Sequence, residues 1–185
     1  MPLIRALKRS SLSEETRAKL TALRDAMEAK DADRLAGLLT GEADPYVRET
    51  AFTHLARLEG EFPAQALVRL MRVGETPLRN AAIETLGSLG ERAIDALALL
   101  LPDADVDARI YALTALQLIE SPRAAELALD VALNDPDVNV RAAAVDVVAE
   151  SGARGMGAAL EKVAARFPDR PYLAFAAHAA QRQLG

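Results

Sequence analysis

The sequence predicts an all-α fold, and three observations support this prediction. Hydrophobic residues make up 51% of the 185 residues while aromatic residues make up only 4%, so the apolar content is mostly Ala, Leu and Val. These residues allow helices to pack closely against one another. A helical segment also recurs at a near-constant spacing, and no segment alternates polar and apolar residues as a half-buried strand does. A chain of this length suits a single domain over residues 1–185.

The N-terminal part of the chain is expected to form a lead segment followed by a pair of helices. The first ten residues contain three positive charges and no acidic residue. Ser11 and Glu14 then match a capping box, which predicts the start of a helix. A shorter helix is expected to begin at Asp31 or Asp33 and to end at Gly41. We interpret this pair as a cap on the N-terminal end of the fold.

Four segments that follow share one pattern of residue types, with an Arg at the fifth position of each. The segments begin at Asp44, Glu75, Asp105 and Asp137. The repeated arginines are Arg48, Arg79, Arg109 and Arg141. Their spacings of 31, 30 and 32 residues match the length of a pair of short helices.

Each repeated Arg is accompanied by an apolar stripe at positions −1, +3 and +7 relative to it. Steps of four residues place these side chains on one face of a helix. The middle position is always Ala, which lets a neighbouring helix approach closely. The stripes are Val47, Ala51 and Leu55; Leu78, Ala82 and Leu86; Ala108, Ala112 and Leu116; and Val140, Ala144 and Val148.

A breaker follows each of these first helices, and a second helix follows each breaker. The breakers are Gly60, Gly90, the Ser121-Pro122 pair and Gly152. The second helices are predicted over residues 62–72, 92–101, 122–133 and 156–167.

A fifth, partial unit begins at Asp169. Its stripe is predicted to be Tyr172, Ala176 and Ala180, with Leu173 in place of the repeated Arg. The predicted divisions are a lead segment, an N-terminal capping pair, four repeats and a C-terminal partial repeat: 1–10, 11–41, 44–74, 75–104, 105–134, 137–168 and 169–185.

The pattern D-P-x-V-R-x-x-A-x-x-x-L, followed by a Gly break and a second Ala/Leu helix, resembles the HEAT-like repeat of the phycobilisome-lyase type. The resemblance covers about residues 44 to 183. It implies a right-handed α-solenoid of stacked antiparallel helix pairs, in which the second helices line a concave face. It does not imply one function, because such folds host many.

The recurring Asp and Arg residues are interpreted as a structural ladder. Asp44, Asp105 and Asp137 stand where a helix N-cap is wanted, and in similar repeats the Arg pairs with such an Asp to join one unit to the next. The predicted ladder consists of Asp44, Arg48, Arg79, Asp105, Arg109, Asp137 and Arg141.

No catalytic residue, metal site or cofactor is predicted. The chain has no Cys, so it offers no thiolate nucleophile and no zinc–thiolate site. The HEAT-like hydroxylases that share this type of repeat carry His-Glu pairs for iron. The two histidines of this chain, His54 and His178, are followed by Leu55 and Ala179. We therefore assign no catalytic residue.

Charge and hydropathy limit the partners. The formal net charge of −5 opposes nucleic-acid binding. No stretch approaches the roughly 18 to 20 consecutive apolar residues of a membrane span. No export signal is visible and Cys is missing, so we expect a cytoplasmic location.

The polar positions of the second helices are the predicted partner-binding groove. They are Gln65, Arg69, Arg72, Asp95, Glu126, Asp130 and Glu161. The charges change from basic to acidic along the chain, so the C-terminal half is expected to prefer a basic segment of a protein partner. The predicted function is that of an adaptor, scaffold or assembly factor.

The alternative function is the handling of a prosthetic group, as in the bilin lyases that share the repeat. A tetrapyrrole needs basic and aromatic groups together, and Tyr46, Phe52, Phe62 and Arg69 are the candidates for it. With so few aromatic residues, a small-molecule ligand is the less favoured expectation.

Overall fold

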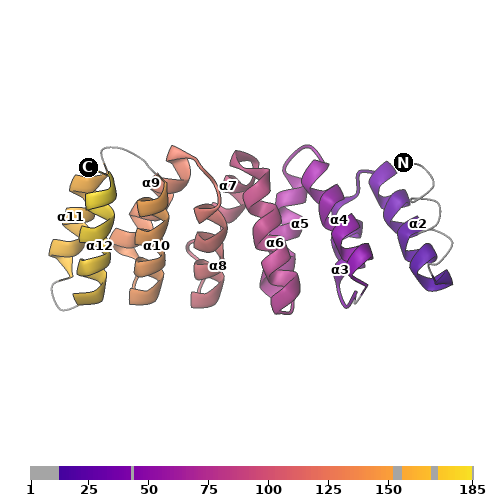
Figure 1. The fold of residues 1–185 in the computed structure, drawn as a ribbon, viewed down its shortest axis with the longest axis horizontal. Helices are drawn as coiled ribbons and strands as arrows, with labels where there is room; N and C mark the ends of the chain where they lie inside the picture. Colours follow the sequence, from indigo (N-terminus) through magenta and orange to yellow (C-terminus); the bar gives the residue numbers. More distant parts are fainter. Residues whose placement is uncertain (1–12, 43, 152–155, 168–170, 185) are drawn as a thin grey trace.

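The helices of this chain form two layers that run side by side along one row (Figure 1). The computed structural model describes residues 13–42, 44–151, 156–167 and 171–184. Within these ranges there are eleven helices and no strand, so this part of the chain is all-helical. The helices are α2 (Glu14–Glu28), α3 (Ala32–Leu39), α4 (Pro45–Arg57), α5 (Phe62–Val73), α6 (Thr76–Leu89), α7 (Glu91–Ala98), α8 (Val106–Gln117), α9 (Pro122–Asn134), α10 (Val138–Glu150), α11 (Gly157–Arg166) and α12 (Pro171–Leu184).

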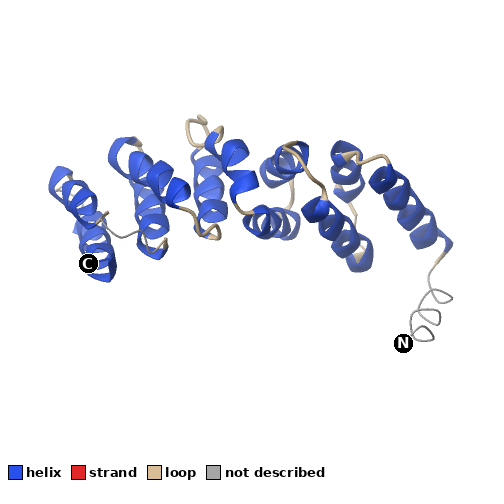
Figure 2. Ribbon diagram, turned by 90° about the horizontal axis from the view of Figure 1, so that it is seen from above, coloured by secondary structure: helices blue, strands red, loops and turns tan. Residues whose placement is uncertain are grey.

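The two layers separate the helices by their order in the chain. The first-helix layer contains α2, α4, α6, α8, α10 and α12, and each of these contacts the next. The second-helix layer contains α3, α5, α7, α9 and α11, again in contact one after another. Figure 2 shows the same row from above, with α2 and α12 at opposite ends in Figure 1. The predicted first and second helices therefore lie in different layers.

The predicted apolar stripes of the four repeated segments are buried, which confirms them. All twelve side chains at positions −1, +3 and +7 are at most 9% exposed. Leu55, Leu86 and Leu116 are fully buried, and each such side chain contributes roughly 1.5–3 kcal/mol of hydrophobic free energy. Because Ala stands at the middle of every stripe, the helices can approach closely there.

The predicted N-caps are also confirmed. Asp44, Asp105 and Asp137 precede α4, α8 and α10, and each carboxylate accepts the backbone N–H two residues further on, at 2.9, 3.0 and 2.7 Å. These bonds satisfy N–H groups that have no partner within the helix. Glu75 holds the same position before α6 but makes no side-chain capping bond.

The breaks between helices fall where the sequence places them. Gly60 and Gly90 have φ values of +91° and +61°, a region that favours glycine. Pro122 opens α9, and Gly152 lies outside the described residues. The helix α7 ends at Ala98, before the predicted residue 101. The chain continues as a turn in which the N–H groups of Leu100 and Leu101 donate to the carbonyls three residues earlier.

Two sequence predictions about the ends of the row need correction. The N-cap of α2 is Ser13, whose Oγ accepts the N–H of Thr16 at 3.1 Å, and not Ser11, which lies outside the described residues. Glu14 is therefore the first residue of the helix, where its negative charge interacts favourably with the positive end of the helix dipole.

The apolar stripe of α12 differs from the prediction at two of its three positions: Tyr172 is exposed and Ala176 is half-buried, whereas Ala180 is buried as predicted. Tyr172 is 71% exposed, whereas Leu173, Ala177 and Ala180 are buried. Leu173 replaces the repeated Arg, and this apolar side chain turns into the core in its place. The predicted starting residue of this unit, Asp169, lies outside the described residues.

Candidate functional site: the second-helix face and the arginine junctions

All seven residues of the predicted groove are exposed on successive helices of the second-helix layer. We call this surface the second-helix face. Gln65, Arg69 and Arg72 lie on α5, Asp95 on α7, Glu126 and Asp130 on α9, and Glu161 on α11.

Four of these residues share one register. Gln65, Asp95, Glu126 and Glu161 each directly follow a buried residue, and the residue four positions further on is again exposed in every case. Residues four apart lie on the same side of a helix. The four helices therefore expose equivalent sides, and the second-helix face is continuous in register from α5 to α11.

Ion pairs neutralise the N-terminal part of this face. Arg69 pairs with Asp33 of α3, and Asp95 pairs with Arg123 of α9. The guanidinium Nη2 of Arg72 lies 3.1 Å from Oδ2 of Asp103. Exposed pairs of this kind contribute only about 0–1 kcal/mol, but they reduce the charge offered to a partner.

The C-terminal part of the face keeps its acidic residues without ion pairs. Glu126, Asp130 and Glu161 have no ion pair within the described residues. The carboxylate of Asp130 accepts a hydrogen bond of 2.8 Å from Asn134 on the same helix. The charged residues of the face are therefore in ion pairs on α5 and α7, whereas the acidic residues on α9 and α11 are not.

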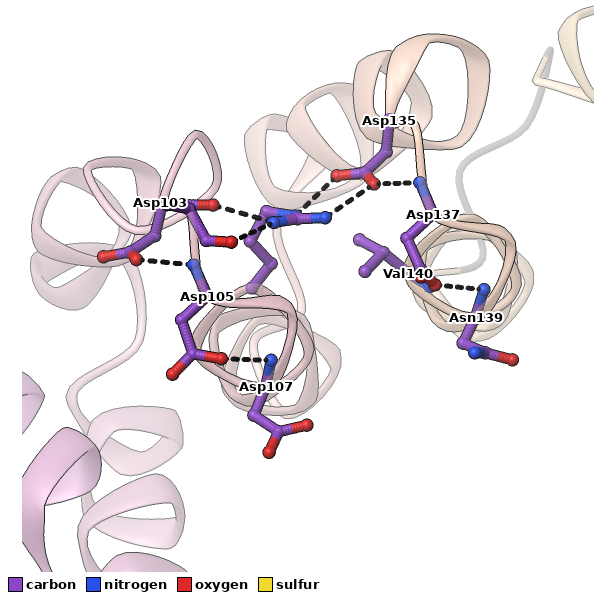
Figure 3. Close-up of polar contacts among 9 residues, drawn as sticks. Asp103, Asp105, Asp107, Asp135, Asp137, Asn139 and Val140 are labelled. Carbon is purple, nitrogen blue, oxygen red and sulfur yellow. Dashed lines mark hydrogen bonds and ion pairs between the residues drawn. The ribbon is translucent and has the colours of Figure 1, made fainter.

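The repeated Arg109 is buried at a junction between units. Figure 3 shows residues of this junction, among them Asp103, Asp135 and Asp137. The Nε and Nη2 of Arg109 donate to the two carboxylate oxygens of Asp135 at 2.8 and 3.0 Å. Its Nη1 donates to the carbonyls of Asp103 and Ala104 at 2.8 and 3.4 Å. Both Arg109 and Asp135 are less than a tenth exposed. The guanidinium thus joins the loop before α8 to the loop before α10.

The partner of Arg109 differs from the sequence prediction. The predicted partner was an N-cap Asp, here Asp137, but that carboxylate is occupied by the first turn of α10. Asp135, two residues earlier, takes its place and also accepts the N–H of Asp137 at 2.8 Å.

We call the residue two positions before each predicted N-cap the acidic position. Glu42, Asp103 and Asp135 hold it, and each accepts the backbone N–H of the capping Asp that follows. Each also pairs with a cation of an earlier part of the chain: Glu42 with Lys19, Asp103 with Arg72 and Asp135 with Arg109. Sequence analysis missed this position, although the acidic-x-Asp spacing at 42–44, 103–105 and 135–137 marks it.

At the N-terminal junction, Lys19 of α2 reaches Glu42 at 3.1 Å, and Thr16 donates to Asp44 at 3.0 Å. The hydrogen bond from the Asp44 amide lowers the pKa of Glu42. The bond from the Thr16 hydroxyl lowers the pKa of Asp44, with the Tyr46 amide adding to the effect. Hydrogen bonds to Glu15 and Glu42 raise the pKa of Lys19. All three groups are therefore held in their charged forms.

The other repeated arginines do not pair with an Asp, so the predicted ladder is not one uniform contact. Arg79 donates to the carbonyls of Met71 and Gly74 at 3.2 and 3.1 Å, and its guanidinium lies 4.5 Å from the ring centre of Tyr111. Arg141 lies 3.8 Å from the ring centre of Phe167.

The side chain of Arg48 makes no hydrogen bond, ion pair or aromatic contact with the part of the chain that the structure describes. It lines an open groove between α4 and α6 instead.

The four residues considered for a tetrapyrrole do not all line the groove between α4 and α6. Only Phe52 lines the groove between α4 and α6; Tyr46, Phe62 and Arg69 are exposed elsewhere on α4 and α5. Among the described residues, no three His, Asp or Glu side chains gather as they would around a metal ion. None of the described helices combines the length and apolar character that a membrane crossing requires.

Comparison with known proteins does not assign the chain to a family. No protein-family model matches the sequence. No curated protein matches it. A crystal structure of an engineered protein from the Northeast Structural Genomics Consortium is similar to 89% of this chain and 83% of its own, with 18% identity and a TM-score of 0.45.

Proposed function

We propose that this chain is a right-handed α-solenoid of HEAT-like repeats and that it works as a protein-binding adaptor, scaffold or assembly factor. The contacts of each helix with the next one in its own layer support a solenoid, because stacking then buries apolar stripes that one helix pair cannot bury alone. The repeated D-P-x-V-R segment supports a HEAT-like repeat of the phycobilisome-lyase type.

One observation carries the protein-binding function: four successive second helices expose polar side chains at one register. Gln65, Asp95, Glu126 and Glu161 differ in chemistry, although the buried positions beside them are consistently apolar. A regular scaffold with a variable exposed row is how repeat proteins form extended binding surfaces.

The preferred partner is a segment with Lys or Arg side chains that binds over α9 and α11. Glu126, Asp130 and Glu161 offer it carboxylates that no described cation occupies. Complementary charge speeds association and selects the partner, and exposed charges are screened at high salt. Binding should therefore weaken as the salt concentration rises.

The experiment is quantitative affinity capture from the native cell with three baits. The baits are the wild-type chain, the triple variant Glu126→Gln/Asp130→Asn/Glu161→Gln, and a control triple variant Asp25→Asn/Asp146→Asn/Glu150→Gln. The control removes the same charge from exposed positions of the first-helix layer. We expect the first triple variant to lose polypeptides that the wild type and the control retain.

Equal capture by all three baits at low salt would contradict the assignment of this face. A coloured or absorbing ligand that copurifies with the wild-type chain would favour the handling of a prosthetic group instead.

A further inference from the structure

A groove of 420 Å³ lies between α4 and α6, and all the residues that line it belong to the first-helix layer. The ring of Phe52 lines the groove and is only 9% exposed. Arg48, Glu49 and Glu84 bring one positive and two negative side chains to it. Its volume falls within the roughly 300–1,000 Å³ of typical ligand pockets.

The groove between α4 and α6 is open because small side chains stand where bulky side chains fill the corresponding space between α6 and α8. Between α6 and α8, Tyr111 lies under the guanidinium of Arg79 and Leu118 fills the space beside Gly87. A Cβ atom at Gly87 would be 2.5 Å from Cβ of Leu118, so little space remains there. Tyr111 and Leu118 lie two and nine residues after Arg109. The residues two and nine positions after Arg79 are Ala81 and Ser88, and both line the groove.

Differences in the sequence of the following unit leave the Arg48 side chain without a partner. The other repeated arginines contact Tyr111, Asp135 or Phe167 of the following unit. For Arg48, the acidic position of the following unit holds Val73 and the position equivalent to Tyr111 holds Ala81. None of the described carboxylates forms an ion pair with this guanidinium, and no described aromatic ring lies against it.

We propose that the groove between α4 and α6 binds an aromatic side chain of a protein partner, which stacks on Arg48 as Tyr111 stacks on Arg79. A cation over an aromatic ring is attracted to its face, and the Phe52 ring offers an apolar contact beside it. Glu49 and Glu84 select for Lys or Arg next to the aromatic residue and against an acidic segment. This site lies on the first-helix layer, so the proposal can be tested independently of the second-helix face.

The test is an NMR titration of the isotope-labelled full chain with three capped tripeptides: Lys-Tyr-Lys, Lys-Ala-Lys and Glu-Tyr-Glu. We expect Lys-Tyr-Lys to shift the amide signals of Thr53, Ala81 and Thr85. The other two peptides should bind at least about tenfold more weakly, because each lacks one part of the complementary chemistry. Equal binding of Lys-Ala-Lys, tighter binding of Glu-Tyr-Glu, or shifts confined to α9 and α11 would each overturn the proposal.

A variant that fills the groove from within the chain supplies the second test. Ala81→Tyr places a ring where Tyr111 stands at the next junction, and we expect it to weaken Lys-Tyr-Lys binding at least about tenfold. Asn80→Tyr adds the same ring to an exposed position that does not line the groove, and should bind like the wild type. If Ala81→Tyr does not fold, Ser88→Leu, which copies Leu118, replaces it. Wild-type affinity in the groove-filling variant would overturn the proposal.

Discussion

The junctions around Arg109 and Arg48 occupy equivalent places in the repeat and behave differently. Arg109 is 6% exposed and holds both oxygens of Asp135, whereas Arg48 is half-buried and borders an open groove. The two arginines do not cause this difference; Asp135 and Val73 of the following units do. The repeated residue therefore acquires its role from the unit stacked on it.

This difference has energetic consequences. A buried ion pair pays a desolvation penalty that is recovered only when the remaining donors and acceptors are satisfied. Arg109 meets this condition through two carboxylate oxygens and two backbone carbonyls. Arg48 is half-buried and holds no such partner, so the same substitution should destabilise the Arg109 junction far more than the Arg48 junction.

The largest expected effect comes from breaking the buried pair. Arg109→Met leaves the Asp135 carboxylate buried without its counter-ion, and should lower the free energy of unfolding by about 3–5 kcal/mol. Arg48→Met removes an unpaired side chain, and should change it by less than about 0.5 kcal/mol. Urea denaturation of both variants and the wild type measures the contrast.

Removing both charges sharpens this test. Arg109→Met combined with Asp135→Leu replaces the pair by apolar side chains and should recover much of the loss. Equal destabilisation by Arg109→Met and Arg48→Met would show that the two junctions do not differ as described.

A smaller effect is expected from Gly→Ala substitutions at two positions, one packed against Leu118 between α6 and α8 and one at an open surface. Gly87→Ala forces the added methyl group against Cβ of Leu118 at 2.5 Å, which should cost about 1–2 kcal/mol after the gain in helix propensity. Gly37→Ala adds the same methyl group to α3, where nothing lies within 4 Å, and should stabilise the fold by up to about 1 kcal/mol. Thermal and urea denaturation distinguish the two signs, and stabilisation of both variants would contradict the packing around Leu118.

The smallest effect is expected at the N-terminal junction and depends on pH. The pKa values of Glu42 and Asp44 are lowered in the folded chain from ordinary values of 4.5 and 3.8. Their contribution is therefore present above those values and is lost as the pH falls through the lowered folded values. Hydrogen exchange between about pH 6 and pH 3 should show α2 losing protection before α10.

Glu42→Gln provides the control for this pH dependence. The amide cannot titrate, so the variant should show weaker protection of α2 at neutral pH and a flatter change below it. The pKa of Lys19 is raised, so its contribution is lost only as the pH rises above 10.5 and does not affect this acidic range. Simultaneous loss of protection in α2 and α10 would contradict a local junction.

Much of the fold follows from local sequence. The stripe at −1, +3 and +7 and the capping residues Asp44, Asp105 and Asp137 are set by helical periodicity and by N–H groups in the first turn, so both were predicted. The Ser13 cap and the buried Leu173 of α12 were not predicted. Ser11 and Ser13 are alternative caps two residues apart, and an apolar Leu173 packs in the core without the polar partners that a buried Arg needs.

The partners of the repeated arginines could not be read from the repeat itself. Asp135 and Phe167 occupy one position of the unit, and Tyr111 another, so each partner depends on which long-range contact forms. The pairing of Arg69 with Asp33 likewise joins helices that are distant in sequence. A one-dimensional pattern identifies the exposed side of α5, whereas the charge left on that side depends on the neighbouring helix.

The central claim is that the side chains of the following unit determine what each repeated arginine does, and a double-mutant cycle at the open junction tests it most directly. Ala81→Tyr is measured by urea denaturation in the wild-type background and in Arg48→Met. We predict that the new ring stabilises the wild-type background by about 0.5–1 kcal/mol more than the Arg48→Met background. An identical effect in both backgrounds would contradict the claim.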